Sequence, residues 1–330
     1  MDFDLTQDQQ DIKAVARELL TARSPWPAVR EAAEAAAYSG ALWRELGELG
    51  WPGIAVAEEH GGQGLGAVEL AVLLEELGYA CAASPFLSTA VAAAVIQATG
   101  NEEQRARYLP ALAAGEATAA IGTRELCADG ADASVLVLLD GDDAVLVDGA
   151  SAGAEAIDVI DSTRRYAAVR GGAAGEPLAA GAADRVRAAV AAEVVGIAQR
   201  ALVMTLAYVK DRRQFGVPVG SFQAVSHRCA QMLLGTESAR STAYFAAWAA
   251  DADPERLPEA AALAGAAAAD AGRDVTASAI QAHGGVGFTW EADVHWLYKR
   301  AQLDFSLLGG ARRHRAALAR IAVERLRVAA

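Results

Sequence analysis

Apolar residues recur at helical spacing through the first third of the chain. After Thr6, which has Gln9 three residues on and so resembles a capping box, the apolar positions are Ile12, Val15, Ala16, Leu19 and Leu20. The same spacing predicts helices over about 40–49, 66–79, 86–99 and 101–113, the last with Asn101 as its N-cap. The pattern therefore predicts an all-helical N-terminal domain over residues 1–116.

Short runs of β-branched and aliphatic residues replace the helical spacing after residue 117. Residues 135–139 and 144–147 are β-prone, and the turn-forming residues 140–143 between them predict a hairpin. Glycine and proline crowd residues 171–177, which predicts a surface loop before the next helix. We therefore expect a small, reduced β domain over residues 117–181.

Long helical patterns return after residue 182. They cover about 182–211, 219–250, 255–283 and 303–327, which predicts a C-terminal four-helix bundle over residues 182–330. The apolar stretch 188–209 contains Glu193, Gln199 and Arg200, which are costly in lipid, so we interpret it as a bundle helix and expect no membrane span. The predicted fold class is mainly α with a small β domain.

Composition narrows the functional classes. Hydrophobic residues make up 53% of the chain and are weighted to alanine, the strongest helix former. The formal net charge is −13, whereas nucleic-acid backbones are bound by clustered Lys and Arg, so no nucleic-acid partner is expected. The three cysteines, Cys81, Cys127 and Cys229, are scattered, so we predict neither disulfides nor a metal site. The acidic N-terminal residues contain no apolar signal core, and a cytoplasmic location is expected.

Two glycine-containing turns between bundle helices carry candidate chemistry. The first contains Arg212, Gln214, Phe215 and Gly216, with Gln223 near the start of the next helix. A guanidinium, an amide and an aromatic ring within one turn suit a pyrophosphate and an adjoining ring system. The alternative is an ordinary connection between helices, since surface turns tolerate arginine and require glycine.

The second turn follows the helix predicted over 255–283. Gln281 precedes the pair Gly284 and Gly285, which would let a backbone approach a ligand closely. Glycine pairs also end helices, which is the alternative. His283 is interpreted as a helix-end cap rather than a catalytic base.

Taken in order, these motifs resemble the acyl-CoA dehydrogenase family, and the likeness covers nearly the whole chain. It includes the segments 50–54, 58–64, 196–202 and 297–301. The resemblance implies an FAD cofactor that lies at an interface with a neighbouring subunit. It implies that the pyrophosphate region is held by Arg212, Gln214, Phe215 and Gln223, and the adenosine end by Gln281, Gly284 and Gly285.

The resemblance also assigns substrate contacts. By it, Asp184 and Arg187 at the start of the first bundle helix would lie beside the acyl-CoA. For Asp184 an alternative stays open, because an acidic residue in the first turn of a helix is stabilised by the helix dipole whether or not substrate is near.

The chain departs from the family at its catalytic base. The family removes the α-proton of the thioester with a glutamate, and an ungapped count puts Leu308 at that position and Gly310 at a threonine near the flavin. Some relatives place the base on the first bundle helix, where the count gives Val186. Neither side chain accepts a proton, so no catalytic residue is assigned.

The β domain also lacks the segments that wrap the flavin ring in the family. Residues 123–125 are only weakly similar to one of these segments. We therefore expect a supporting subunit that lends flavin-binding residues to a homologous catalytic subunit, as an α2β2 assembly that passes electrons to an electron-transfer flavoprotein. The chain resembles short, base-less subunits of bacterial dehydrogenases for steroid side-chain thioesters. Two alternatives remain, a self-sufficient dehydrogenase with Asp184 as a displaced base and a non-catalytic scaffold.

Overall fold

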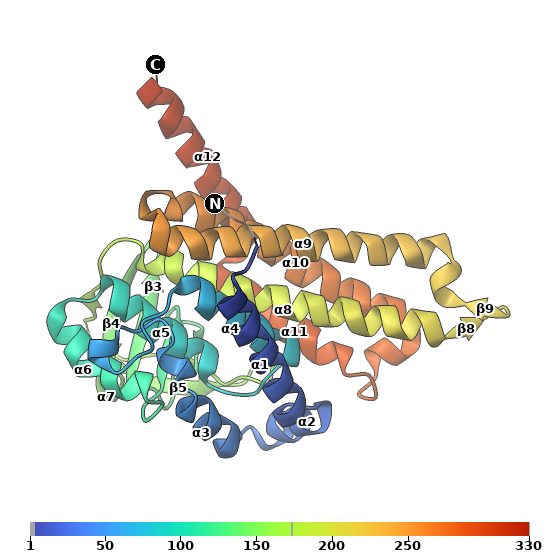
Figure 1. Ribbon diagram of the computed structural model, residues 1–330, viewed down its shortest axis with the longest axis horizontal. Helices are drawn as coiled ribbons and strands as arrows, with labels where there is room; N and C mark the ends of the chain where they lie inside the picture. Colours follow the sequence, from blue (N-terminus) through green and yellow to red (C-terminus); the bar gives the residue numbers. More distant parts are fainter. Residues whose placement is uncertain (1–3, 173, 330) are drawn as a thin grey trace.

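The computed structural model describes residues 4–172 and 174–329, which are mostly helical (Figure 1). The N-terminal region is built from α1 Gln7–Arg23, α2 Trp26–Ala35, α3 Gly40–Glu48, α4 Ala67–Ala80, α5 Phe86–Thr99 and α6 Glu102–Ala113, with the 3-10 helices η1 Trp51–Gly53 and η2 Glu58–His60. The predicted capping box at Thr6 is present, and Asn101, predicted as an N-cap, also forms a capping box with Gln104. Helices α3 to α6 lie within one residue of their predicted ends.

Helix α2 is an addition to the predicted set. Pro25 and Pro27 flank its first residue, and prolines ordinarily punctuate a sequence. Proline is tolerated in the first turn of a helix because the N–H groups there have no helical acceptor. The two prolines therefore start this helix instead of interrupting it.

A seven-stranded sheet forms the middle of the chain. Its strands are β1 Ala119–Gly122, β2 Cys127–Ala128, β3 Val135–Asp140, β4 Asp143–Asp148, β5 Ala154–Ile157, β6 Tyr166–Val169 and β7 Glu176–Pro177, in the order β5-β6-β2-β1-β3-β4-β7. Only the β1–β3 pair is parallel. The predicted hairpin is the β3–β4 pair, in which Asp140 faces Asp143, and the one-turn helix α7 Gly149–Ala152 follows it.

Five helices form the C-terminal region. They are α8 Ala182–Asp211, α9 Gln223–Ala252, α10 Leu257–His283, α11 Val294–Leu308 and α12 Gly310–Ala329, with the 3-10 helices η3 Val219–Ser221, η4 Pro254–Arg256 and η5 Gly284–Phe288. Helices α8 to α11 pack together, and α10 contacts all the others. The fold class predicted from the sequence is confirmed.

The helix predicted over 303–327 is wrong as a single element. The structure has α11 and α12 there, separated at Gly309 and Gly310, whose φ angles are 78° and 74°. Two successive left-handed residues end an α-helix, and glycine adopts that conformation without a steric penalty. Helix α12 consequently leaves the bundle at an angle and projects from the body (Figure 1).

Helix α8 is long and apolar enough to cross a membrane by composition alone. However, 67% of its most apolar window is buried inside the protein, where it packs against α4, α9 and α10. The contact with α4 is close because glycines lie on both sides of it. A Cβ added at Gly196 would lie 1.8 Å from the Glu75 carbonyl oxygen, and one at Gly78 would lie 2.1 Å from that of Glu193. Core packing therefore accounts for the apolar sequence of α8.

Candidate functional site

The first predicted turn is a tight hairpin at one end of the bundle. Its strands, β8 Arg213–Gln214 and β9 Val217–Pro218, enclose two turn residues, Phe215 and Gly216, with φ angles of 53° and 82°. A two-residue turn with both φ angles positive matches the twist of the flanking strands. Phe215 is an uncommon residue in this conformation, and its side chain is 94% exposed. The hairpin thus holds an aromatic ring out in solvent.

The other predicted residues of this end also face solvent. Arg212, Gln223 and Gln281 are exposed, and their side chains form no hydrogen bond or ion pair with any residue that the structure describes. The Gln214 side chain bonds only to the neighbouring Arg213 carbonyl, at 2.7 Å. The hydrogen-bond donors of this end are therefore available to a group from outside the chain.

The second turn lies at the same end of the bundle as the first (Figure 1). Tyr208 near the end of α8 stacks on His283 at the end of α10, with ring centroids 4.4 Å apart, and its hydroxyl donates to the His283 carbonyl at 3.2 Å. Gly284 has a φ of 64°, which favours glycine, and a Cβ added at Gly284 or Gly285 would meet nothing within 4 Å. The backbone of this turn is therefore open to approach.

His283 itself is tied into the helix. Its Nδ1 lies 2.7 Å from the Ala279 carbonyl oxygen, and burial lowers the pKa of the imidazole although that hydrogen bond opposes the shift. The side chain has the geometry of the helix-end cap expected from the sequence.

A cleft of about 750 Å³ lies at the opposite end of α8. It is bounded by the β3–β4 turn, the first turns of α8 and α10, and α12. Asp184 and Arg187 both line it, and Arg187 Nη1 lies 2.9 Å from Asp184 and 3.2 Å from Asp142. Burial raises the pKa of the Asp184 carboxyl, with the Arg187 charge opposing it. The structure brings together the two residues predicted to lie beside an acyl-CoA.

The arginines of this cleft form ion pairs and hydrogen bonds with the β3–β4 turn. Asp142 lies 3.2 Å from Arg313 and 3.3 Å from Arg320 of α12, in addition to its contact with Arg187. The Gly141 carbonyl accepts hydrogen bonds from Arg187 and Arg313. A ligand that used Arg187 would have to displace the Asp142 carboxylate.

Both expected base positions are apolar and buried. Leu308 is 1% exposed at the end of α11, and Val186 is 3% exposed in the second turn of α8. Beside Leu308, the His314 ring Nε2 lies 2.7 Å from the Leu308 carbonyl, and burial lowers the pKa of His314 to about 4. That nitrogen donates to the carbonyl and is not a proton acceptor.

A buried cluster of charges lies one turn before Leu308 on α11, and no sequence pattern predicts it. Arg164 lies 2.8 Å from Asp304 and also pairs with Glu193 of α8. Arg300 donates to the Thr163 and Ala82 carbonyls, at 2.9 Å each. These side chains are at most 3% exposed. Because the paired residues are distant in sequence, no local spacing marks them.

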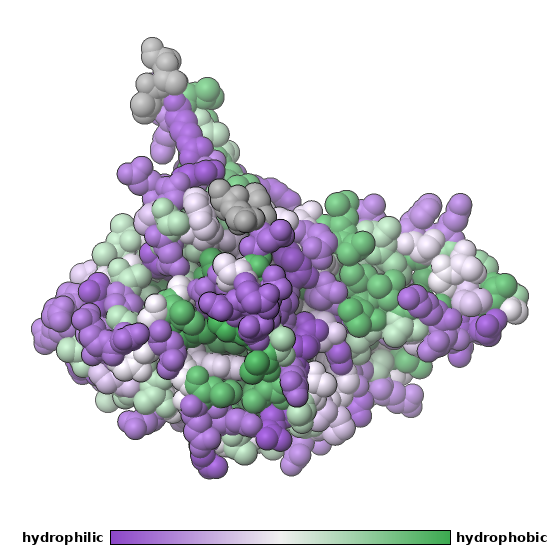
Figure 2. All heavy atoms as spheres, viewed as in Figure 1, coloured by the Kyte–Doolittle hydropathy of each residue, from purple (hydrophilic) through white to green (hydrophobic). Residues whose placement is uncertain are grey.

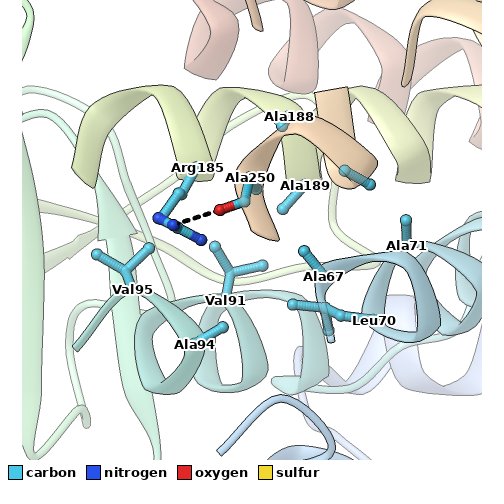
Figure 3. Close-up of a pocket in the computed structure, with 11 residues that line it drawn as sticks. Ala67, Leu70, Ala71, Val91, Ala94, Val95, Arg185, Ala188, Ala189 and Ala250 are labelled. Atoms are coloured by element: carbon cyan, nitrogen blue, oxygen red, sulfur yellow. Dashed lines mark hydrogen bonds between the residues drawn. The ribbon is translucent and has the colours of Figure 1, made fainter. Parts of the chain in front are cut away.

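A small apolar void lies beside the first turns of α8 (Figure 3). Alanines of α4, α5, α8 and α9 line it, and Arg185 closes one side by donating to the Ala250 carbonyl at 2.6 Å. Its volume of about 30 Å³ corresponds to one or two water molecules. It is a packing defect among small side chains and too small for an acyl group.

Two family models match the chain. Residues 6–116 match the acyl-CoA dehydrogenase N-terminal domain, and residues 173–323 match the acyl-CoA dehydrogenase C-terminal domain. The chain is 35% identical over 314 residues to acyl-CoA dehydrogenase IpdE2 of Mycolicibacterium smegmatis, with 92% of this chain and 96% of the relative covered.

Two solved structures exemplify the similarity in fold. The Tcur3481-Tcur3483 steroid ACAD G363A variant superposes with a TM-score of 0.88 at 27% identity, covering 96% of this chain and 98% of that one. The ChsE4-ChsE5 complex from Mycobacterium tuberculosis superposes with a TM-score of 0.85 at 25% identity, covering 98% of both chains.

Proposed function

Because this chain belongs to the acyl-CoA dehydrogenase family, whose members are flavoproteins, we propose that it is the supporting subunit of a heteromeric dehydrogenase. In this proposal it lends its exposed turns to an FAD bound mainly by a homologous catalytic subunit. The assembly would be α2β2, would act on an acyl-CoA thioester in the cytoplasm, and would pass electrons to an electron-transfer flavoprotein.

One observation carries the proposal, namely the length of α8. The cleft with Asp184 lies at its start and the Arg212 turn follows its end, 30 residues later. At a rise of about 1.5 Å per residue, the two lie about 45 Å apart, farther than one bound flavin spans. A flavin held by Arg212 therefore belongs to another subunit's site.

The exposed turns fit part of a dinucleotide. Arg212 offers a planar guanidinium for a pyrophosphate, and Phe215 offers a ring face beside it. Gln214, Gln223 and Gln281 would add amide donors, and the open backbone at Gly284 and Gly285 leaves room for the adenosine end. Arg213 shares the turn but is not assigned a contact.

The residues at the two expected base positions support a catalytic role for the partner. Leu308 and Val186 cannot take the α-proton of the thioester, so in this proposal the carboxylate comes from the other subunit. When bound, FAD supplies the acceptor for the β-hydride, which side chains cannot supply. The residues of this chain would bind and orient the cofactor.

The relatives support a substrate class. One solved neighbour is a steroid ACAD, and we propose a bulky steroid side-chain thioester for the present assembly. Asp184 and Arg187 would contact the acyl-CoA in the cleft after the Asp142 turn moves away.

Co-expression with a full-length homologue that carries the glutamate tests the assembly. We expect one FAD for each pair of unlike subunits and no flavin absorbance from this chain alone. A yellow, active homo-oligomer of this chain alone would contradict the proposal.

Single substitutions test the lent residues. Arg212→Ala should reduce flavin retention in the complex, while Arg213→Ala, which removes an equal charge from the same exposed turn, should leave it unchanged. Unchanged retention in Arg212→Ala favours a scaffold instead. Asp184→Asn should keep turnover; its abolition would favour the alternative in which Asp184 is the base.

A further inference from the structure

A second cavity, remote from both turns, lies between the N-terminal helices and α8. Its volume is about 320 Å³, and its walls include Leu20, Pro25, Trp26, Pro27, Tyr79 and Arg200. Helices α1, α2, α4 and α8 all contribute to it. The cavity combines aromatic and aliphatic walls with the guanidinium groups of Arg17 and Arg200 and the carboxylate of Glu76.

Both guanidinium groups lie over the same ring. Arg17 is 3.4 Å from the Tyr79 ring centroid, and Arg200 is 5.0 Å from it and 5.6 Å from that of Trp26. The charge of Arg17 is compensated, because it pairs with the buried carboxylate of Glu76, one bond being 3.0 Å. Lys13 also lies 3.0 Å from Glu76.

Arg200 lacks such a partner. Its one hydrogen bond is from Nη1 to the Tyr79 hydroxyl, at 3.3 Å, and its Nε is buried without an acceptor. Across residues 4–172 and 174–329, no carboxylate lies within ion-pair distance of it. Among the described residues, Arg200 is therefore a guanidinium in the cavity wall that has no ion-pair partner.

We propose that this cavity binds a carboxylate that carries an adjacent apolar or planar group. Arg200 would pair with the carboxylate, since a guanidinium matches its two oxygens in one plane. Trp26 and Tyr79 would pack against the apolar part. The carboxylate can come from a free organic acid or from an acidic side chain of another protein, because both present the same chemistry. This inference does not depend on the flavin proposal, which rests on other elements.

Benzoate is a suitable first probe, with benzamide as its neutral isostere. Titration of the full chain, followed by calorimetry and by tryptophan fluorescence, should show benzoate binding at least tenfold tighter than benzamide. Arg200→Gln should weaken benzoate binding at least tenfold, and Arg200→Lys should weaken it less. Arg170→Gln, on the exposed surface of the β domain, is the matched control and should bind as the parent does.

A blocked dipeptide, N-acetyl-Asp-Leu-amide, distinguishes the two sources when compared with its Asn-Leu counterpart. Binding of the acidic dipeptide alone identifies a protein segment as the ligand, and binding of benzoate identifies a free acid.

Three outcomes overturn the inference. They are equal binding of benzoate and benzamide, absence of binding by both acidic probes, and full affinity in a folded Arg200→Gln. Far-UV circular dichroism checks the folding of each variant. Should Arg200→Gln not fold, Trp26→Leu serves in its place, because it removes one wall and keeps the charge; unchanged benzoate affinity in that variant also overturns the inference.

Discussion

At the scale of single residues, the least tolerant side chains are the buried charges between the sheet and the bundle. Arg164 is the only cation within hydrogen-bond distance of both Asp304 and Glu193 among the described residues. Four polar atoms of this cluster lack a hydrogen-bond partner, namely Arg164 Nε, Glu193 Oε2, Arg300 Nε and Asp304 Oδ2. Loss of one of the remaining hydrogen bonds of the cluster should therefore destabilise the protein more than loss of an exposed hydrogen bond.

Arg164→Met should lower the free energy of unfolding by about 3–5 kcal/mol, because it removes the guanidinium that is hydrogen-bonded to both buried acids and leaves Glu193 with only Arg300, 3.7 Å away. The adjacent Arg165 pairs with the exposed Asp132 at 3.4 Å, so Arg165→Met should cost at most about 1 kcal/mol. Urea unfolding of both variants makes the comparison. Equal losses would show that the cluster is not a buried ion pair network.

The contribution of this cluster to stability should depend on pH because of Asp304. Burial raises the pKa of its carboxyl well above the ordinary value, with the neighbouring Glu193 charge adding to the shift. The folded state then holds a proton that the unfolded state releases above about pH 4, so this group's contribution to stability falls as pH rises from there through the folded pKa. Asp304→Asn should flatten that slope in unfolding measured against pH. A variant with the parent's slope would assign the dependence to other groups.

At the scale of elements, the sequence predicted what local chemistry determines. Apolar spacing, with the Asn101 cap for α6, placed α3 to α6 within one residue, and the turn at 140–143 placed the β3–β4 hairpin. Helix α2 and the break at Gly309 and Gly310 have local causes that the prediction did not use, and the other features that it missed depend on contacts between distant segments. The pairing of residue 164 with residues 193 and 304, and of residue 142 with α12, has no local signature. The candidate turns were visible as motifs in the sequence. Their position at one end of the bundle is seen in the structure, where Tyr208 stacks on His283.

The close crossing of α4 and α8 requires Gly78 and Gly196, and the helical pattern of the sequence does not reveal this role. Gly196→Ala should destabilise the protein by about 3 kcal/mol, because its Cβ would overlap the Glu75 carbonyl and force the helices apart. Gly40→Ala is the control, since a Cβ there meets nothing within 4 Å and the position begins α3. Thermal and urea unfolding measure both. A stable Gly196→Ala would mean that α4 shifts at little cost.

At the scale of the whole molecule, the bundle extends well beyond the body and ends in the exposed hairpin (Figure 1). Hydrophobic spheres gather over α8 and α9 between the body and that hairpin (Figure 2), and exposed apolar side chains there include Val203, Leu233 and Leu234. Apolar surface beside an exposed aromatic residue is typical of a protein interface. The shape and the surface therefore favour association through this end.

A substitution of Phe215 can distinguish an effect on association from an effect on folding. Its ring makes one aromatic contact, with Phe222 at 6.2 Å, and its backbone is left-handed, a conformation that asparagine also adopts. Phe215→Asn should therefore change the stability of the isolated chain by no more than about 0.5 kcal/mol. In the proposed complex, loss of a large aromatic contact should weaken binding to the proposed catalytic homologue at least about tenfold. Val15→Asn on α1, exposed by 51%, is the control for removing a surface apolar group and should leave affinity unchanged. Calorimetric titration of the two subunits measures the affinities. Parental affinity in Phe215→Asn would place the partner elsewhere on the chain, and with it the flavin that Arg212 is proposed to hold.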